Sequence, residues 1–307
     1  MRIMHSPTLK ASLVALVAGL ALIEAAPQDG PQIFATPLAA AQALVEAAAQ
    51  NDTAALLKVL GPGGKDIVQS GDAVDDKAAR TEFAAHARAR LQVEPDRDNP
   101  NRAMLVIGDQ NWPFPVPLIR QDGGWYFDTA TGRVEILARR IGRNELAAID
   151  TCRAYVEAQM EYALRVHNSH GLLTYAQRIV SSPGKQDGLY DEGDSANLAP
   201  KSFADAAAIP QQGKTPVPYH GYFYHILTSQ GPDALEGEMD YVVSGDMIGG
   251  FALVAWPAEY GVSGVQTLIV NYRGIVYEKD LGPETETLAR QMAKFNPDKT
   301  WRAVAGE

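Results

Sequence analysis

Aromatic, histidine and carboxylate side chains gather around two expected strands in the C-terminal third of the chain. A set of this kind forms a binding surface for peptide or glycan when the rings are exposed, and ordinary core packing when they are buried. No catalytic signature accompanies them, so we interpret them as a non-catalytic binding surface and leave core packing as the alternative. The six candidate binding residues are Tyr219, His220, Tyr222, Trp256, Glu259 and Tyr260.

Carboxylates near the same strands give an enzymatic alternative. Glu259 and Asp280, with Asp240 and Asp246 nearby in sequence, supply the residue type that works in pairs as general acid and base. A pair separated by about 5–10 Å across a cleft is the arrangement that glycosidases use. The alternative function is therefore a periplasmic hydrolase acting on glycan or peptide.

The remaining reactive residues have simpler explanations. His167 and His170 have a zinc-like spacing, but Gly171 follows at once and no third ligand is indicated. Cys152 is the single cysteine and lies among apolar residues at helical spacing, which excludes an intrachain disulfide and favours an inert buried thiol. We expect no metal and no cofactor.

The N-terminus has the pattern of a cleavable secretory signal. Arg2 and Lys10 precede an uncharged run over residues 11–23, and small residues stand before Pro27. This run is shorter than the roughly 20 residues that cross a bilayer, and no later segment is long and apolar enough to do so. We expect a signal peptide over residues 1–26, a periplasmic or secreted location, and no membrane span after cleavage.

Composition limits the partners. Apolar residues make up 46% of the 307 residues and charged residues 21%, which are ordinary globular values. The net charge is −10, and it becomes −11 once Arg2, Lys10 and Glu24 leave with the signal. This charge repels nucleic acid, so the expected partner is an envelope protein or a glycan.

The length favours two α+β modules. In the first, residues 33–143, three helical patterns over 38–49, 54–60 and 75–91 precede an antiparallel meander whose apolar runs include 103–107, 114–119, 125–128 and 132–143. In the second, residues 144–304, Asn144 caps a long helix to His167. Strands over 221–229, 251–257, 266–271 and 275–280 and a helix near 283–295 follow an irregular stretch over 181–218.

Several strings along the chain resemble the exported bacterial domain-of-unknown-function 2950 family. They include 112–117, 123–128, 139–145, 183–190, 218–224, 247–261 and 276–282, and together they extend over nearly the whole mature chain. Asp191 and Glu192 depart from the pattern, since an aromatic residue is expected after Tyr190. The resemblance implies export and no settled activity.

Two weaker resemblances concern the modules. The order of elements in the first module resembles the cone-shaped folds related to nuclear transport factor 2. The long helix followed by a sheet is similar to pseudopilins.

The preferred interpretation is an exported envelope protein that acts as a non-catalytic binding, assembly or accessory factor. Besides the hydrolase, a small-ligand carrier remains open, with an apolar cavity lined by Trp112, Phe114 and Trp125 in the first module.

Overall fold

The computed structural model describes residues 30–69, 73–168, 170–207 and 216–305. The expected signal peptide, residues 1–26, lies outside these residues. The fold is α+β, as the sequence predicts, and its contacts divide the chain into two compact units between Thr129 and Ala130. The sequence predicts the boundary between the modules at 143/144, which is further along the chain than this division. Each unit has its own buried core.

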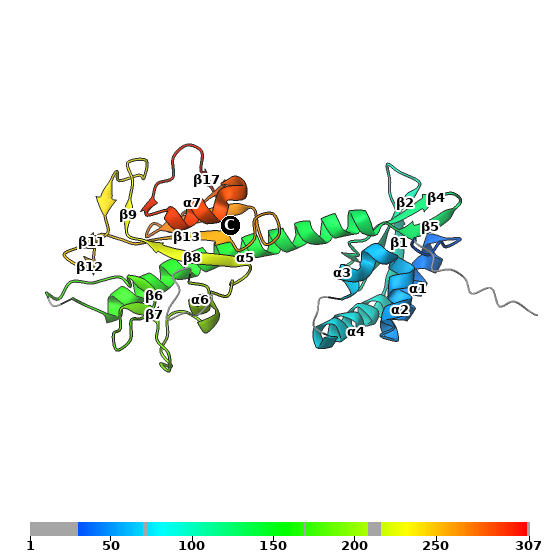
Figure 1. Ribbon diagram of the computed structural model, residues 1–307, viewed down its shortest axis with the longest axis horizontal. Helices are drawn as coiled ribbons and strands as arrows, with labels where there is room; N and C mark the ends of the chain where they lie inside the picture. Colours follow the sequence, from blue (N-terminus) through cyan, green and yellow to red (C-terminus); the bar gives the residue numbers. More distant parts are fainter. Residues whose placement is uncertain (1–29, 70–72, 169, 208–215, 306–307) are drawn as a thin grey trace, which may run out of the picture. The chain divides into compact units, whose positions relative to one another are not determined.

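The N-terminal unit packs helices on one face of an antiparallel sheet (Figure 1). Its helices are α1 Pro37–Ala49, α2 Thr53–Leu60, η1 Pro62–Gly64, α3 Lys65–Val68 and α4 Ala73–Ala89. Its strands are β1 Leu91–Pro95, β2 Arg102–Ile107, β3 Trp112–Pro113, β4 Leu118–Gln121 and β5 Gly124–Phe127, in the order β1-β2-β4-β5 with β3 beside β2. Thr36 and Asp52 cap α1 and α2 through their side chains, which explains where these helices begin.

The core of this unit follows from the alternation of its strands. Leu105, Leu118 and Phe127 point from β2, β4 and β5 toward the helices and are fully buried. The helix α1 contributes three buried residues to the same core, Ala40, Ala41 and Leu44. The sequence missed β1, because it assigned Leu91 to the preceding helix.

The strand expected over 132–143 is wrong. These residues belong to one helix, α5 Thr129–Arg165, which also contains the helix expected from Asn144. Val134, Leu137 and Ile141 are spaced three and four residues apart, which is a helical period and not the alternation of a strand. Asn144 is therefore inside the helix and does not cap it.

The C-terminal unit consists of a central sheet with helices on both faces. Its strand order is β17-β15-β14-β13-β8, all antiparallel. The main strands are β8 Tyr222–Leu227, β13 Ala252–Pro257, β14 Gln266–Asn271 and β15 Val276–Asp280, close to the predicted ranges, and β17 is Arg302–Ala303. Figure 1 shows α5 along one side of β8 and β13 and α7, Thr285–Gln291, on the other.

Short elements complete the unit. They are β6 Arg178–Val180, β7 Gly188–Tyr190, α6 Lys201–Asp205, β9 Ser229–Gln230, β10 Met239–Asp240, β11 Val242–Val243, β12 Asp246–Met247, η2 Gly282–Glu284 and β16 Lys294–Phe295.

The buried face of α5 repeats at helical spacing through Ala148, Cys152, Tyr155, Gln159 and Tyr162. In the described part of the chain, no helix combines the length and the apolar character that a membrane span requires.

Candidate functional site

Four of the six predicted binding residues lie at one end of the C-terminal sheet. Tyr222 pairs with Pro257, and Gln266 pairs with Asp280, so β8 and β14 begin where β13 and β15 end. We call this region the sheet end. The predicted residues that it carries on its connecting segments are Tyr219, His220, Glu259 and Tyr260.

A tight turn presents His220 at the sheet end. The backbone N–H groups of Tyr219 and Tyr222 each donate to the other residue's carbonyl at 3.0 Å, and the residues between them, His220 and Gly221, have φ of 51° and 74°. Two positive φ angles are the signature of a type I′ turn. The turn exposes His220 and places its ring against that of Tyr219 in a tilted arrangement, with centroids 4.1 Å apart.

The other two predicted residues are not on the surface. Tyr222 and Trp256 are fully buried, so the exposed aromatic surface expected from the sequence does not include them. Tyr222 lies on the α5 side of the sheet, and its hydroxyl donates to the carbonyl of Gln266 at 2.9 Å. Trp256 lies on the α7 side beneath the guanidinium of Arg290, 5.7 Å from its ring centroid. Both residues build the core beneath the sheet end.

The carboxylates at the sheet end are held in different ways. Asp280 accepts from the hydroxyl of Tyr260 at 3.3 Å and from the backbone N–H of Gly282 at 2.8 Å, so both of its oxygens have donors. The bond to Asp280 raises the pKa of Tyr260. Glu259 is exposed, and its side chain has no hydrogen-bond partner among the described residues. Asp280 thus serves as a structural acceptor that orients Tyr260.

Two residues of α5, Asn144 and Glu145, hold the sheet end in place. The sequence predicts that the helix begins at these residues. Asn144 donates to the carbonyl of Ser263 at 2.8 Å. The Glu145 carboxylate accepts from the backbone N–H groups of Val265 and Gln266 at 2.9 and 3.0 Å. Both contacts join residues more than 100 positions apart, so no local pattern in the sequence predicts them.

The described residues do not gather metal ligands. Nowhere in ranges 30–69, 73–168, 170–207 and 216–305 do three His, Cys, Asp or Glu side chains come together in a way that would hold a metal ion. His167 and His170 lie beyond the end of α5 at Arg165, so they do not share a helical face. Burial raises the pKa of the Cys152 thiol to about 12, which makes it a poor nucleophile.

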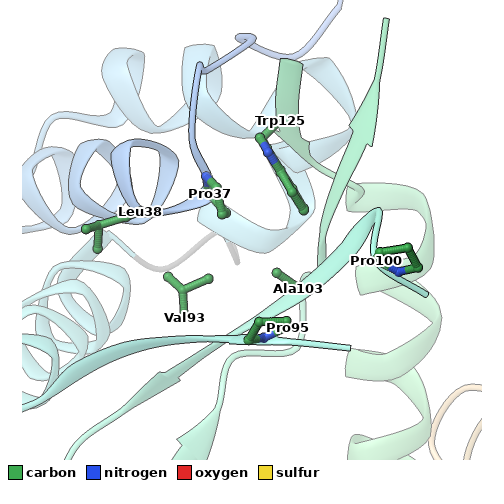
Figure 2. A pocket seen from close by; sticks show the side chains of 7 residues that line it. All are labelled: Pro37, Leu38, Val93, Pro95, Pro100, Ala103 and Trp125. Atoms are coloured by element: carbon green, nitrogen blue, oxygen red, sulfur yellow. The ribbon is translucent and has the colours of Figure 1, made fainter. Parts of the chain in front are cut away.

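A cavity lies in the N-terminal unit, between its sheet and the first turn of α1. We call it the apolar groove. Its volume is about 410 Å³, within the range of small-molecule sites. Figure 2 shows its lining side chains arranged around an open space, with Trp125 on one wall between Pro37 and Ala103. The lining residues are Pro37, Leu38, Val93, Pro95, Pro100, Ala103 and Trp125.

The apolar groove differs from the cavity expected for a small-ligand carrier. Trp125 lines it, whereas Trp112 and Phe114 do not. Phe114 is buried in the core, where its ring packs edge-on against Phe127 at 6.1 Å, and Trp112 is 45% exposed on the short strand β3. Of the three aromatic residues named for the carrier, only Trp125 lines this groove, because the apolar type of a residue does not reveal whether it faces a cavity, the core or the solvent.

A smaller crevice in the C-terminal unit has a volume of about 80 Å³. It lies between α5 and α6, and Tyr155, Phe203 and Tyr219 contribute its aromatic walls. Its volume is well below the 300–1,000 Å³ of typical ligand sites, so it holds at most a single small group. The apolar groove is therefore the stronger candidate binding site.

Fold and groove together define an α+β protein of two units with an apolar cavity in the first. The chain belongs to the family described as "Protein of unknown function (DUF2950)", whose model matches residues 31–304. The resemblance seen in the sequence is thereby confirmed. No curated protein and no solved structure matches the chain. The likenesses to cone-shaped folds and to pseudopilins stay predictions.

Proposed function

We propose that this protein is a non-catalytic binding protein and that the apolar groove of its N-terminal unit receives a small apolar ligand. The observation that carries the proposal is the cavity of about 410 Å³ between α1 and the sheet. Four elements contribute to it: α1 through Leu38, β1 through Val93, β2 through Ala103 and β5 through Trp125. Secondary structure holds these walls, so the groove is largely preformed, as ligand sites usually are.

The chemistry of the walls favours binding over catalysis. Six of the seven lining side chains are aliphatic, and the seventh is the indole of Trp125. None of them is a nucleophile, an acid or a base, so the groove offers no group that transfers a proton or attacks a substrate. Removal of apolar ligand surface from water supplies about 25 cal/mol per Å², which is the dominant attraction such walls provide.

We also propose export to the periplasm or the medium, with residues 1–26 removed. The basic N-terminus, the short apolar run and the small residues before Pro27 support this proposal. N-terminal sequencing of the protein recovered from a periplasmic extract tests it. A first residue at or near Pro27 is expected, and an intact Met1 in the cytoplasmic fraction would refute export.

Fluorescence titration of the mature chain with Nile red, an uncharged apolar dye, tests binding in the groove. Leu38→Asp is the informative variant, because it places a carboxylate in the lining at an exposed position in the first turn of α1, where the helix dipole tolerates an acidic residue. Leu235→Asp is the matched control, since Leu235 is 77% exposed in the C-terminal unit and lies outside the groove.

We expect saturable binding by the wild type, an unchanged Kd for Leu235→Asp and at least tenfold weaker binding for Leu38→Asp. Thermal unfolding followed by circular dichroism shows whether each variant is folded. Equal binding by the two folded variants would mean that the dye binds elsewhere, and the groove would lose its proposed role.

A further inference from the structure

The walls of the apolar groove contain few hydrogen-bond donors. Pro37, Pro95 and Pro100 supply three of its seven lining residues, and a proline has no backbone N–H. Three other lining side chains, those of Leu38, Val93 and Ala103, are aliphatic. Whatever occupies the groove is therefore held mainly by apolar contact.

The sheet edge beside the groove is also poorly suited to a peptide. β1 is the outermost strand of its sheet and pairs only with β2 among the described strands. The backbone N–H of Gly108 donates to the carbonyl of Arg90, and the backbone N–H of Asp96 donates to the carbonyl of Arg102. In an antiparallel pair, every second residue from Arg90 to Asp96 therefore directs its backbone N–H and carbonyl toward β2. Leu91, Val93 and Pro95 consequently turn their backbone groups outward.

Pro95 interrupts this outward row. An added strand needs successive N–H donors along the edge, and Pro95 has none, which is the usual way in which an edge strand is protected from pairing. Val93 and Pro95 both line the groove, so a peptide lying there gains little from main-chain hydrogen bonds. A small molecule with an apolar body fits these walls better than an extended peptide does.

Trp125 contributes the single side-chain donor among the seven lining residues. Its backbone N–H and carbonyl are already paired with Phe34, at 2.7 and 2.8 Å. Its indole N–H, in contrast, has no acceptor within the part of the chain that the structure describes. Because the residue is only half-buried, this donor is not forced to find a partner inside the protein.

We infer that the ligand is a lipid-like molecule carrying one uncharged hydrogen-bond acceptor, such as a ketone, ester or ether, which the indole N–H of Trp125 binds. This inference rests on the proposed function and deepens it. The apolar walls exclude a charged head group from the groove, because no counter-charge lines it and burying an unpaired ion is costly. The indole, which donates and does not accept, selects an acceptor.

Two isosteric probes test the inference by displacement of Nile red. In 2-nonanone a carbonyl oxygen is the acceptor, and in 2-methyl-1-nonene a methylene group of similar shape replaces it. We expect the ketone to displace the dye at about three- to tenfold lower concentration, after correction for the aqueous solubility of each probe. Trp125→Phe, which keeps an aromatic ring and loses the N–H, should remove this preference.

Trp112→Phe is the control, because Trp112 is exposed and does not line the groove. It should keep the preference for the ketone. In ¹H–¹⁵N spectra the indole signal that is absent from Trp125→Phe should move downfield when the ketone binds and stay near its place when the alkene binds.

The outcomes separate the two proposals. Equal displacement by both probes, with no effect of Trp125→Phe, would overturn the inference about the acceptor and leave binding in the groove intact. Failure of Nile red itself to bind would remove the proposed function. Stronger displacement by a leucine- or proline-rich peptide than by either probe would overturn the choice of a small molecule.

Discussion

The Glu145 carboxylate accepts a hydrogen bond from the backbone N–H of Gln266 at 3.0 Å, 121 positions along the chain. The same oxygen accepts from Val265 at 2.9 Å. One half-buried side chain of α5 thus satisfies two donors at the start of β14, and it fixes the sheet end against the helix.

Replacing this carboxylate should destabilise the C-terminal unit. Glu145→Ala leaves the N–H groups of Val265 and Gln266 without their acceptor, and we expect a loss of about 1–3 kcal/mol in the free energy of unfolding. Urea unfolding followed by tyrosine and tryptophan fluorescence measures it. Glu157→Ala on the exposed side of α5 is the control and should change stability by less than about 0.5 kcal/mol. Similar values for the two variants would show that the bonds contribute nothing.

The turn at His220 and Gly221 requires glycine at position 221, because there is no room for a side chain there. Gly221 has φ of 74°, and a Cβ there would lie 2.6 Å from the Asn144 amide nitrogen. Gly274 has φ of 76° and open space around it, so Gly274→Ala should cost only the backbone term of about 1–2 kcal/mol. Gly221→Ala should cost more in the same unfolding assay. Adding Asn144→Ala to Gly221→Ala should recover part of that excess, and strict additivity would argue against the contact.

Substitutions of Trp256 and Tyr260 should differ in their effect on stability. The sequence predicts that both residues lie on one surface. Trp256 is fully buried, so Trp256→Ala should destabilise the unit by about 3–5 kcal/mol. Tyr260 loses mainly its bond to Asp280, and Tyr260→Ala should cost less than about 1 kcal/mol. Chemical unfolding of both variants checks this difference. A small effect of Trp256→Ala would contradict the burial of its side chain.

The buried thiol should make stability depend on alkaline pH. Burial raises the pKa of Cys152 to about 12 from an ordinary value of 9.0. The unfolded chain therefore loses this proton first, and the native state loses stability as the pH rises from about 9 to about 12. Between pH 8.5 and 10 we expect the wild type to lose about 1 kcal/mol more than Cys152→Ala does, because the variant lacks the group. Parallel pH profiles of the two proteins would show that the thiol is not the cause.

The sequence predicted most elements because their periods are local. The four long strands of the C-terminal sheet and the helices α1, α2 and α4 follow from apolar spacing, cap residues and glycine turns. Residues 132–143 were assigned wrongly to a strand because only their apolar character was considered, whereas the helical spacing of Val134, Leu137 and Ile141 places them in α5.

The candidate sites were harder to predict. The residue types at Tyr222 and Trp256 do not distinguish a groove wall from a core, since both use large aromatic rings, and only the packing of α5 and α7 on the two sheet faces settles their burial. The apolar groove joins residues from 37 to 125, and Pro95 and Pro100 look like ordinary loop signals in the sequence. Trp125 alone was recognised, as an aromatic residue in a strand after a glycine turn.

Mapping of amide signals during a titration with 2-nonanone tests the central claim most directly. With ¹⁵N-labelled mature protein, ¹H–¹⁵N spectra report which backbone positions sense the ligand. We predict that the largest shifts occur at Leu38, Val93, Ala103 and Trp125, while Gly221 and Glu259 at the sheet end remain unchanged. Shifts confined to the sheet end, or saturating ligand without any shift around the groove, would contradict the claim that the apolar groove is the binding site.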